Sequence, residues 1–321
     1  MNAPKAVDAS IFEPVSCYCC SSTAHEPFVS AQEDLTGKPG WFHFVRCDEC
    51  GLVYQHPRID VEHIKDYYDD EYIAHRKKKD WGSLTFVYNY VMDQLDRKKD
   101  QIVRPYVKPG KANEVLDVGC GAGTFLNMMR LVHDARVTGV DFKDFEGADG
   151  FEDIDFRCGL FYEQDFREEH FDLVTMWHFL EHDYDPLRTL ETARLVMKDD
   201  AHLVVEVPRL DSVTFRLYRE RWPGLQAPQH TALYDKQRLL ELMERAGFDI
   251  VDYLPYGAFP AYFYLFAGAA FKLLKGKGLD LQKWGYVYVL GQILTLPVLA
   301  FEKKLNLAMQ TVVCRKGKSN V

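Results

Sequence analysis

The stretch NEVLDVGCGAGTFL, residues 113–126, decides the fold of this 321-residue chain. Residues 115–118 form a short apolar run that is typical of a buried strand. Glycines alternate over residues 119–123, and a helical apolar pattern begins at Phe125. A strand, a glycine turn and a helix in this order form the first unit of a doubly wound α/β fold, in which ligands lie at the carboxyl ends of the strands.

The residues around this turn discriminate between two nucleoside cofactors. A second expected strand, ARVTGVD, ends at Asp141, 22 residues after Gly119, where a carboxylate can accept hydrogen bonds from ribose hydroxyls. A dinucleotide fingerprint needs a third glycine where this chain has Thr124. Asp117 repels phosphate but suits the sulfonium and ammonium groups of S-adenosylmethionine. The pattern therefore favours S-adenosylmethionine over NAD, which leaves an NAD-dependent oxidoreductase as the alternative of another class.

Over residues 105–255 the sequence resembles the class I S-adenosylmethionine-dependent methyltransferases. Besides the glycine turn, the resemblance is carried by FDLVTMWHFLEHDYDP (171–186), HLVVEVPRL (202–210) and WPGLQAPQHTALYDKQRLLELMERAGFDIV (222–251). Arg209 departs from the family pattern, because relatives often carry Asn there. The resemblance implies a Rossmann-like, mostly parallel seven-stranded sheet.

The resemblance also implies a set of cofactor-binding residues and an acceptor site. The cofactor-binding residues are Asp117, Gly119, Gly121, Asp141, Phe142, Leu160 (or its neighbour Phe161), Trp177 and His178. Methyl transfer requires alignment of the acceptor and, where the nucleophile carries a proton, a base. Histidine suits that role at neutral pH, so we expect His182 and His230 to be catalytic. Glu181 would orient a histidine or bind a polar acceptor.

The first fifty residues contain two C-x-x-C pairs, Cys17/Cys20 and Cys47/Cys50. Two such turns can surround a tetrahedral zinc ion, and four thiolates leave no open position for catalysis. We therefore expect a structural zinc ribbon, with Cys19 as a bystander. The expected organisation is a zinc-ribbon-like domain at 1–60, a helical bridge at 61–108 and a methyltransferase domain at 109–321.

The charge of the chain is uneven. The net charge is −9, which argues against a nucleic-acid partner, yet residues 255–321 carry a local balance of +7. Two uncharged runs, 253–271 and 285–301, lie in or next to an insertion at about 255–306, between the last two expected strands. The lysines that flank these runs are Lys272, Lys275, Lys277, Lys283, Lys303 and Lys304.

Three interpretations of the insertion are open: a membrane-spanning hairpin, a lid buried on the core, or a helical pair that covers the active-site mouth and dips into a membrane interface. We favour the third, with a lipid-like or membrane-associated small-molecule acceptor. No secretory signal pattern precedes the fold, so we expect a cytoplasmic location, peripheral at the inner face of the membrane. The alternatives are a methyltransferase of a nucleotide-linked sugar or other soluble metabolite, and a non-catalytic binding module.

Overall fold

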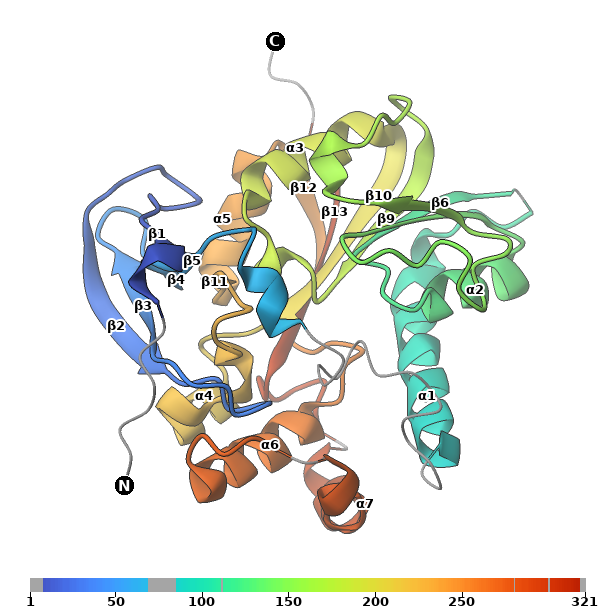
Figure 1. Cartoon of the computed structure of the whole chain (residues 1–321). Helices are drawn as coiled ribbons and strands as arrows, with labels where there is room; N and C mark the ends of the chain where they lie inside the picture. The colour runs from blue at the N-terminus through green and yellow to red at the C-terminus, as the bar shows by residue number, and fades with distance from the viewer. Residues whose placement is uncertain (1–7, 69–84, 111, 280, 300, 318–321) are drawn as a thin grey trace.

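The computed structural model describes residues 8–68, 85–110, 112–279, 281–299 and 301–317 (Figure 1). Residues 69–84 of the expected bridge lie outside them. The largest sheet has seven strands in the order β12-β13-β10-β9-β6-β7-β8. These strands are β6 (Glu114–Val118), β7 (Arg136–Asp141), β8 (Asp155–Cys158), β9 (Phe171–Trp177), β10 (Met197–Pro208), β12 (Phe248–Leu254) and β13 (Met309–Lys316).

Strands β6 to β10 run parallel, and β13 runs antiparallel to both of its neighbours. The predicted α/β class, with a mostly parallel seven-stranded sheet, is confirmed. The helices are α1 (Thr85–Val103), α2 (Thr124–His133), α3 (Pro186–Val196), α4 (Val213–Tyr218), α5 (Lys236–Arg245), α6 (Ala261–Leu274) and α7 (Leu281–Leu299). Short 3-10 turns are η1 (Ala9–Ile11), η2 (Ile64–Tyr67), η5 (Arg104–Tyr106), η6 (Phe161–Glu163), η7 (Leu180–His182), η8 (Arg219–Arg221) and η9 (Pro223–Leu225).

Alternating side chains of the central strands build two cores. Val115 and Leu173 point to the face that α1 and α2 cover, where they share a cluster with Phe125. Leu116 and Val174 point to the other face, which α3 and α5 cover. This period of two is what a strand buried on both faces requires.

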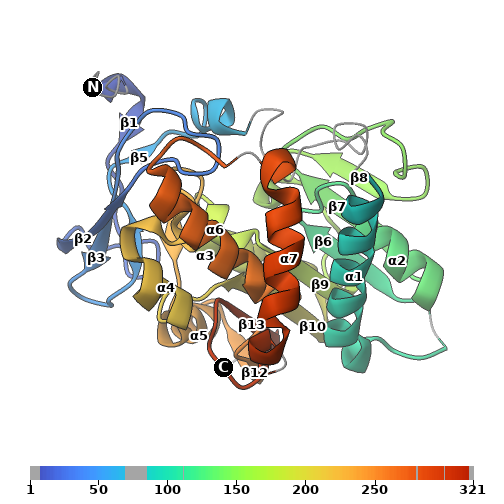
Figure 2. The same ribbon diagram turned by 90° about the horizontal axis from the view of Figure 1, so that it is seen from below.

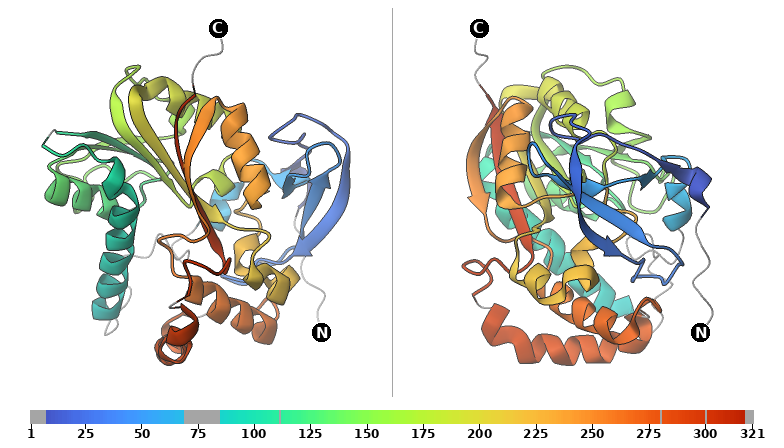
Figure 3. Two further views of the ribbon diagram at one scale, coloured as in Figure 1. Left: turned by 180° about the vertical axis from the view of Figure 1, so that it is seen from behind. Right: turned by 90° about the vertical axis from the view of Figure 1, so that its left-hand side faces the viewer.

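A smaller sheet occupies the N-terminal part of the molecule. Its order is β11-β4-β3-β2, and a separate pair, β1 with β5, lies beside it. The strands are β1 (Phe12–Glu13), β2 (His25–Ala31), β3 (Phe42–Cys47), β4 (Val53–Gln55), β5 (Arg58–Ile59) and β11 (Ala232–Leu233). Because β11 comes from the methyltransferase-like part, the N-terminal sheet is completed by a distant segment. Figure 3 shows α5 between this sheet and strands β12 and β13.

Helices α6 and α7 occupy the stretch between β12 and β13, which confirms the predicted helical insertion. They lie together at one end of the molecule, with α7 outermost (Figures 1 and 2). The turn between them contacts the hairpin loop between β2 and β3, where the N–H of Leu279 donates to the carbonyl of Leu35 at 2.9 Å. Within the described ranges, no helix has both the length and the apolar character that crossing a membrane requires.

Candidate active site

The glycine turn after β6 is shaped by main-chain bonds to the neighbouring strand. The N–H groups of Gly119 and Cys120 donate to the carbonyl of Val140 at 2.8 and 3.1 Å. Gly119 has φ of 77°, and a Cβ there would lie 2.7 Å from the ring of Phe179. Gly121 also has positive φ, 51°, but a Cβ there would meet nothing within 4 Å. The turn therefore packs tightly on one side and leaves open space at Gly121.

Two carboxylates lie at this end of the sheet. Asp141 accepts the N–H of Gly121 at 2.9 Å and that of Lys143 at 3.0 Å, and burial raises its pKa. Asp117 is 2% exposed and accepts the hydroxyl of Thr175 at 2.6 Å. Burial raises the pKa of Asp117 to about 7. The structure thus brings both predicted carboxylates to the glycine turn, with Asp117 the deeper of the two.

The predicted cofactor-side apolar residues lie in different environments. Phe142 is 44% exposed, and its ring centroid lies 5.1 Å from that of Tyr68. Trp177 is buried, with its ring 5.5 Å from that of Phe125, and its indole N–H finds no acceptor among the described residues. Leu160 is half-buried immediately before η6. Phe142 is therefore the member of this set that is open to a ligand at its ring.

Helix α1 adds a charged group that the sequence analysis missed. The ammonium of Lys99 lies 5.5 Å from the ring centroids of both Phe125 and Trp177. It also lies 3.9 Å from the carboxylate of Asp96. Its positive charge opposes the effect of burial on the pKa of Asp117. Nothing in the helical pattern of this segment distinguishes Lys99 from its neighbour Lys98.

His178 forms part of a buried charge cluster at the end of β9. Its Nε2 lies 3.0 Å from Glu206 Oε1, and its Nδ1 lies 3.5 Å from Glu181 Oε1. Burial lowers the pKa of His178, but the two carboxylates outweigh it and raise that pKa to about 9. The ring is therefore an imidazolium at neutral pH, which cannot accept a proton. Its φ of 54° is a strained conformation for a residue with a side chain.

The two histidines predicted to be catalytic lie together, although 48 positions separate them in the sequence. The ring centroids of His182 and His230 are 4.4 Å apart. Nδ1 of His182 lies 3.0 Å from the carbonyl of Gln229 and 2.9 Å from the hydroxyl of Tyr68, and Nδ1 of His230 lies 2.8 Å from the carbonyl of Gly224. A carbonyl only accepts, so we assign the ring protons to Nδ1. Burial lowers the pKa of both rings, which leaves each Nε2 unprotonated.

Glu181 completes this cluster, the acceptor-side cluster. Both of its carboxylate oxygens are buried, and within the described part of the chain neither has a hydrogen-bond partner. Donor atoms of Glu181, His182 and His230 all lie within 4.8 Å of one another. One carboxylate and two imidazoles can take up a proton or hold a divalent ion. The sequence analysis did not single out this trio as a metal site, because its spacing matches no ligand signature.

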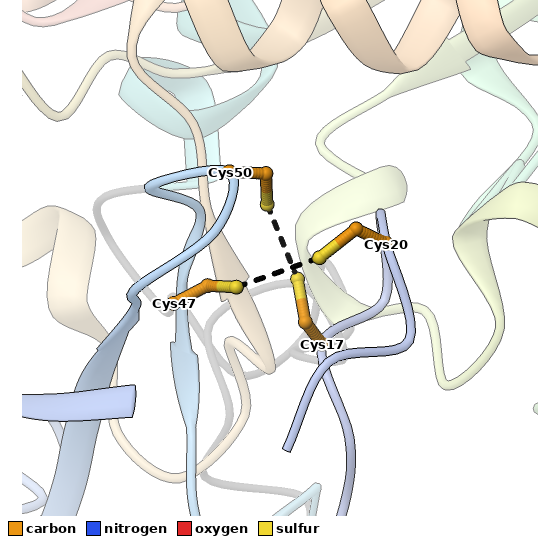
Figure 4. A group of neighbouring side chains, drawn as sticks. All are labelled: Cys17, Cys20, Cys47 and Cys50. Atoms are coloured by element: carbon orange, nitrogen blue, oxygen red, sulfur yellow. Dashed lines mark hydrogen bonds between the residues drawn. The ribbon is translucent and has the colours of Figure 1, made fainter. Parts of the chain in front are cut away.

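The four N-terminal cysteines predicted as zinc ligands converge (Figure 4). The Sγ atoms of Cys17 and Cys50 are 3.4 Å apart, those of Cys20 and Cys47 are 3.5 Å apart, and all four lie within 4.8 Å. Zn–S bonds of about 2.3 Å in a tetrahedron separate sulfurs by about 3.8 Å. The donor set and its spacing therefore fit a structural zinc ion. Cys19 is buried nearby and is not part of the group.

The cysteine group is fixed to helix α5 by two arginines. Arg238 donates to the carbonyl of Cys50, and Arg245 donates to the carbonyl of Cys19. These charged donors hold both cysteine turns against the large sheet.

Comparisons with known proteins consistently find methyltransferases. A family model described as a methyltransferase domain matches residues 90–253. A probable S-adenosylmethionine-dependent methyltransferase of Mycolicibacterium smegmatis is 27% identical over 147 residues, 44% of this chain and 54% of that protein. A ubiquinone biosynthesis O-methyltransferase of Hahella chejuensis is 28% identical over 153 residues, 45% of this chain and 60% of that protein. The chain thus spans little more than half the length of these curated relatives.

Among solved structures, the chain is similar to Burkholderia thailandensis 1,6-didemethyltoxoflavin-N1-methyltransferase, which holds its acceptor and S-adenosylhomocysteine. The two are 16% identical, with 84% of this chain and 98% of that chain covered and a TM-score of 0.47.

Proposed function

Because the chain belongs to the methyltransferase domain family, we propose that it transfers the methyl group of S-adenosylmethionine to a small, lipid-like or membrane-associated acceptor. The observation that carries the cofactor is the open space at Gly121 beside the carboxylate of Asp141. A carboxylate offers about four lone-pair sites. The main-chain N–H groups of Gly121 and Lys143 take up part of this capacity on Asp141, and the rest is available to ribose hydroxyls.

Residues around the turn complete the cofactor site. Gly119, Gly121 and Asp117 hold the methionine end, and Phe142 offers its exposed ring to the adenine. Leu160, Trp177 and His178 close the site at the ends of the neighbouring strands. When bound, S-adenosylmethionine supplies an activated methyl group on a sulfonium.

The acceptor-side cluster aligns the acceptor and takes its proton. His182 and His230 each have Nδ1 committed to a carbonyl, so an acceptor hydroxyl or amine can donate its proton to a free Nε2 as its lone pair attacks the methyl carbon. The imidazolium of His178 cannot be this base. The buried carboxylate of Glu181, whose Oε1 also lies 3.5 Å from the His178 ring, stabilises whichever of the two histidines becomes charged.

Cys17, Cys20, Cys47 and Cys50 hold a structural zinc ion in this proposal. All four ligands come from the protein, so the ion has no open position for the acceptor. Its contribution is to fold the N-terminal sheet, and the methyl group never passes through it.

The membrane part of the proposal rests on α7. Val287, Leu290, Ile293 and Leu294 are 51–72% exposed. Their spacings of three, four and seven place them on one side of the helix. An apolar strip of this kind on the outermost helix is suited to the interface of a bilayer.

Charge complementarity commits this surface to anionic lipid. The lysines at the ends of α6 and α7 give the C-terminal part its positive balance, whereas the rest of the chain is acidic. Each lysine close to an anionic surface contributes about 1 kcal/mol. The acidic body then stays on the cytoplasmic side.

Two measurements test the proposal. Calorimetric titration with S-adenosylhomocysteine should show one site per chain, and absence of binding at millimolar ligand in the folded, zinc-loaded protein would remove the cofactor. Incubation with methyl-tritiated S-adenosylmethionine and either a lipid extract or an aqueous metabolite extract of the source cells should label the lipid fraction. Label confined to the aqueous fraction would instead assign a nucleotide-linked sugar or other soluble acceptor.

A further inference from the structure

The loop that carries His230 has the N-terminal sheet on one side. Strand β4 ends at Gln55, which is fully buried. The side-chain Nε2 of Gln55 donates to the carbonyl of Pro228 at 2.8 Å and to that of His230 at 2.6 Å. Its main-chain N–H donates to the carbonyl of Thr231 at 2.8 Å. One residue therefore makes three hydrogen bonds to a stretch of four.

The other side of the same loop faces the acceptor-side cluster. The N–H of Thr231 donates to the carbonyl of Glu181 at 2.7 Å, and its hydroxyl donates to the carbonyl of Asp183 at 2.7 Å. The carbonyl of Gln229 receives Nδ1–H of His182. The position of this loop therefore determines where both histidine rings lie, because His230 belongs to it and His182 is bonded to it.

Gln55 fixes the loop directly beside the residue that orients His182. The two carbonyls that its amide holds flank Gln229, whose own carbonyl orients His182. The amide group has two N–H donors, and both are needed to hold two carbonyls at once. A methionine or a glutamate of similar length fills the same space but offers neither donor.

We propose that Gln55 is a positioning residue of the acceptor site, and that the N-terminal cysteine domain is thereby a working part of that site. Through Pro228 and His230, Gln55 sets where the two histidines present their free Nε2 atoms. The inference rests on the proposed function only for the role of those histidines in methyl transfer. A displacement of about 1 Å at such a group can cost about a hundredfold in rate.

The test compares Gln55→Met with a matched control, Gln310→Met. Gln310 is also fully buried and donates its Nε2 to a main-chain carbonyl, that of Tyr234, at 2.8 Å. Its variant reports the effect of losing a buried glutamine amide that binds Tyr234 rather than the loop at 228–231. Both proteins are measured at full length with zinc present. S-adenosylhomocysteine is the binding probe, and the rate is that of label transfer from methyl-tritiated S-adenosylmethionine to the cell extract.

For Gln55→Met we expect a rate about tenfold to a hundredfold lower, with affinity for S-adenosylhomocysteine within about twofold of the wild type. Nitrogen-15 histidine spectra should show His182 and His230 with altered ring shifts and altered titration. Gln310→Met should leave both signals unchanged. Wild-type positions of both ring signals in Gln55→Met would overturn the inference.

Two further measurements keep the outcome decisive. If Gln55→Met does not fold, the side-chain amide protons of Gln55 in the wild type decide the matter, because rapid exchange with solvent would contradict the two hydrogen bonds. If instead His182→Gln and His230→Gln retain full activity, the proposed role of these histidines in methyl transfer fails, while the ring signals still report whether Gln55 positions the loop.

Discussion

The two ends of the candidate site are built in different ways. The cofactor end is built mainly on one continuous stretch, residues 114–142, to which the ends of neighbouring strands add Leu160, Trp177 and His178. Its polar contacts are largely main-chain N–H groups of a glycine turn. The acceptor end is assembled from β4, η7 and the loop before β11, and its polar contacts are side chains. A site made of backbone is fixed once its strand and helix form, whereas a site made of side chains depends on every segment that holds them. The two ends should therefore respond differently to substitution.

The largest effect is expected when the zinc site, which supports the acceptor end, is removed. Cys47→Ser should abolish zinc binding and the yield of folded protein, because binding energies of structural zinc sites, about 10–16 kcal/mol in small peptides, are also folding energies. Metal analysis of purified protein measures it. Cys19→Ser, in the Cys17–Cys20 turn but outside the group, should keep one zinc per chain. Full zinc occupancy in Cys47→Ser would refute the ligand assignment.

The next largest effect is expected at the acceptor end. His182→Gln or His230→Gln should reduce the rate of label transfer by about 10²- to 10⁴-fold and leave binding of S-adenosylhomocysteine unchanged. Because burial lowers the pKa of both rings, the base stays unprotonated below pH 6.5, and its loss by protonation should appear only once the pH drops through that lowered value. Burial raises the pKa of Asp117 to about 7, so a rate that falls above pH 6.5 in Asp117→Asn as well as in the wild type would exclude these rings as the base.

A smaller effect is expected at the cofactor end. Asp141→Ala and Asp117→Ala should each weaken S-adenosylmethionine binding roughly tenfold to a hundredfold, since a hydrogen bond to a charged group contributes about 1.5–3 kcal/mol. The control is Asp144→Ala, an exposed carboxylate three residues after β7. Titration calorimetry measures all three proteins, and unchanged affinity in both test variants would move the cofactor pocket elsewhere.

The smallest effects are expected in the insertion at 255–306. They test whether the acceptor end of the site receives its acceptor from a membrane. The wild type should float with anionic liposomes, and a protein with residues 256–304 replaced by a short turn should not. Single changes such as Lys277→Glu should weaken binding several-fold, with more effect at low salt, because each lysine contributes about 1 kcal/mol. Leu131→Ser, an exposed leucine on α2, is the control. A wild type that stays unbound at low salt makes the insertion a lid or an oligomer contact.

The sequence was sufficient for the cofactor end because its signals are local. The glycine turn, Asp141 and the pattern of the strands lie within reach of simple periodicity, and the observed β6 and β7 match the predicted strands closely. The end of the sheet was less well defined: β13 begins at Met309, two residues after the predicted start. Leu307 and Ala308 precede the strand and are apolar like its own residues, so the sequence alone does not mark where the strand begins.

The acceptor end was only partly predictable. The resemblance supplied His182 and His230, but no local pattern could indicate that Gln55 would meet His230, because 175 positions separate them. The charge of His178 was partly hidden, since it depends not only on Glu181, three positions on, but also on Glu206, 28 positions away. Lys99 lay in a helix beside a second lysine, Lys98, and no local pattern separates the two. Such residues acquire a role only through tertiary contacts.

The pairing of β4 with β11 has a consequence for how this protein is made. The ribosome delivers the cysteine turns and β4 early, but their sheet lacks its fourth strand until Ala232 and Leu233 have been synthesised. During that interval the edge of β4 is open to pairing with another chain. For the same reason, an N-terminal region exchanged between two related proteins should transplant well only if the loop and strand at 226–233 travel with it. We therefore expect the N-terminal sheet and residues 226–233 to be exchanged together in evolution.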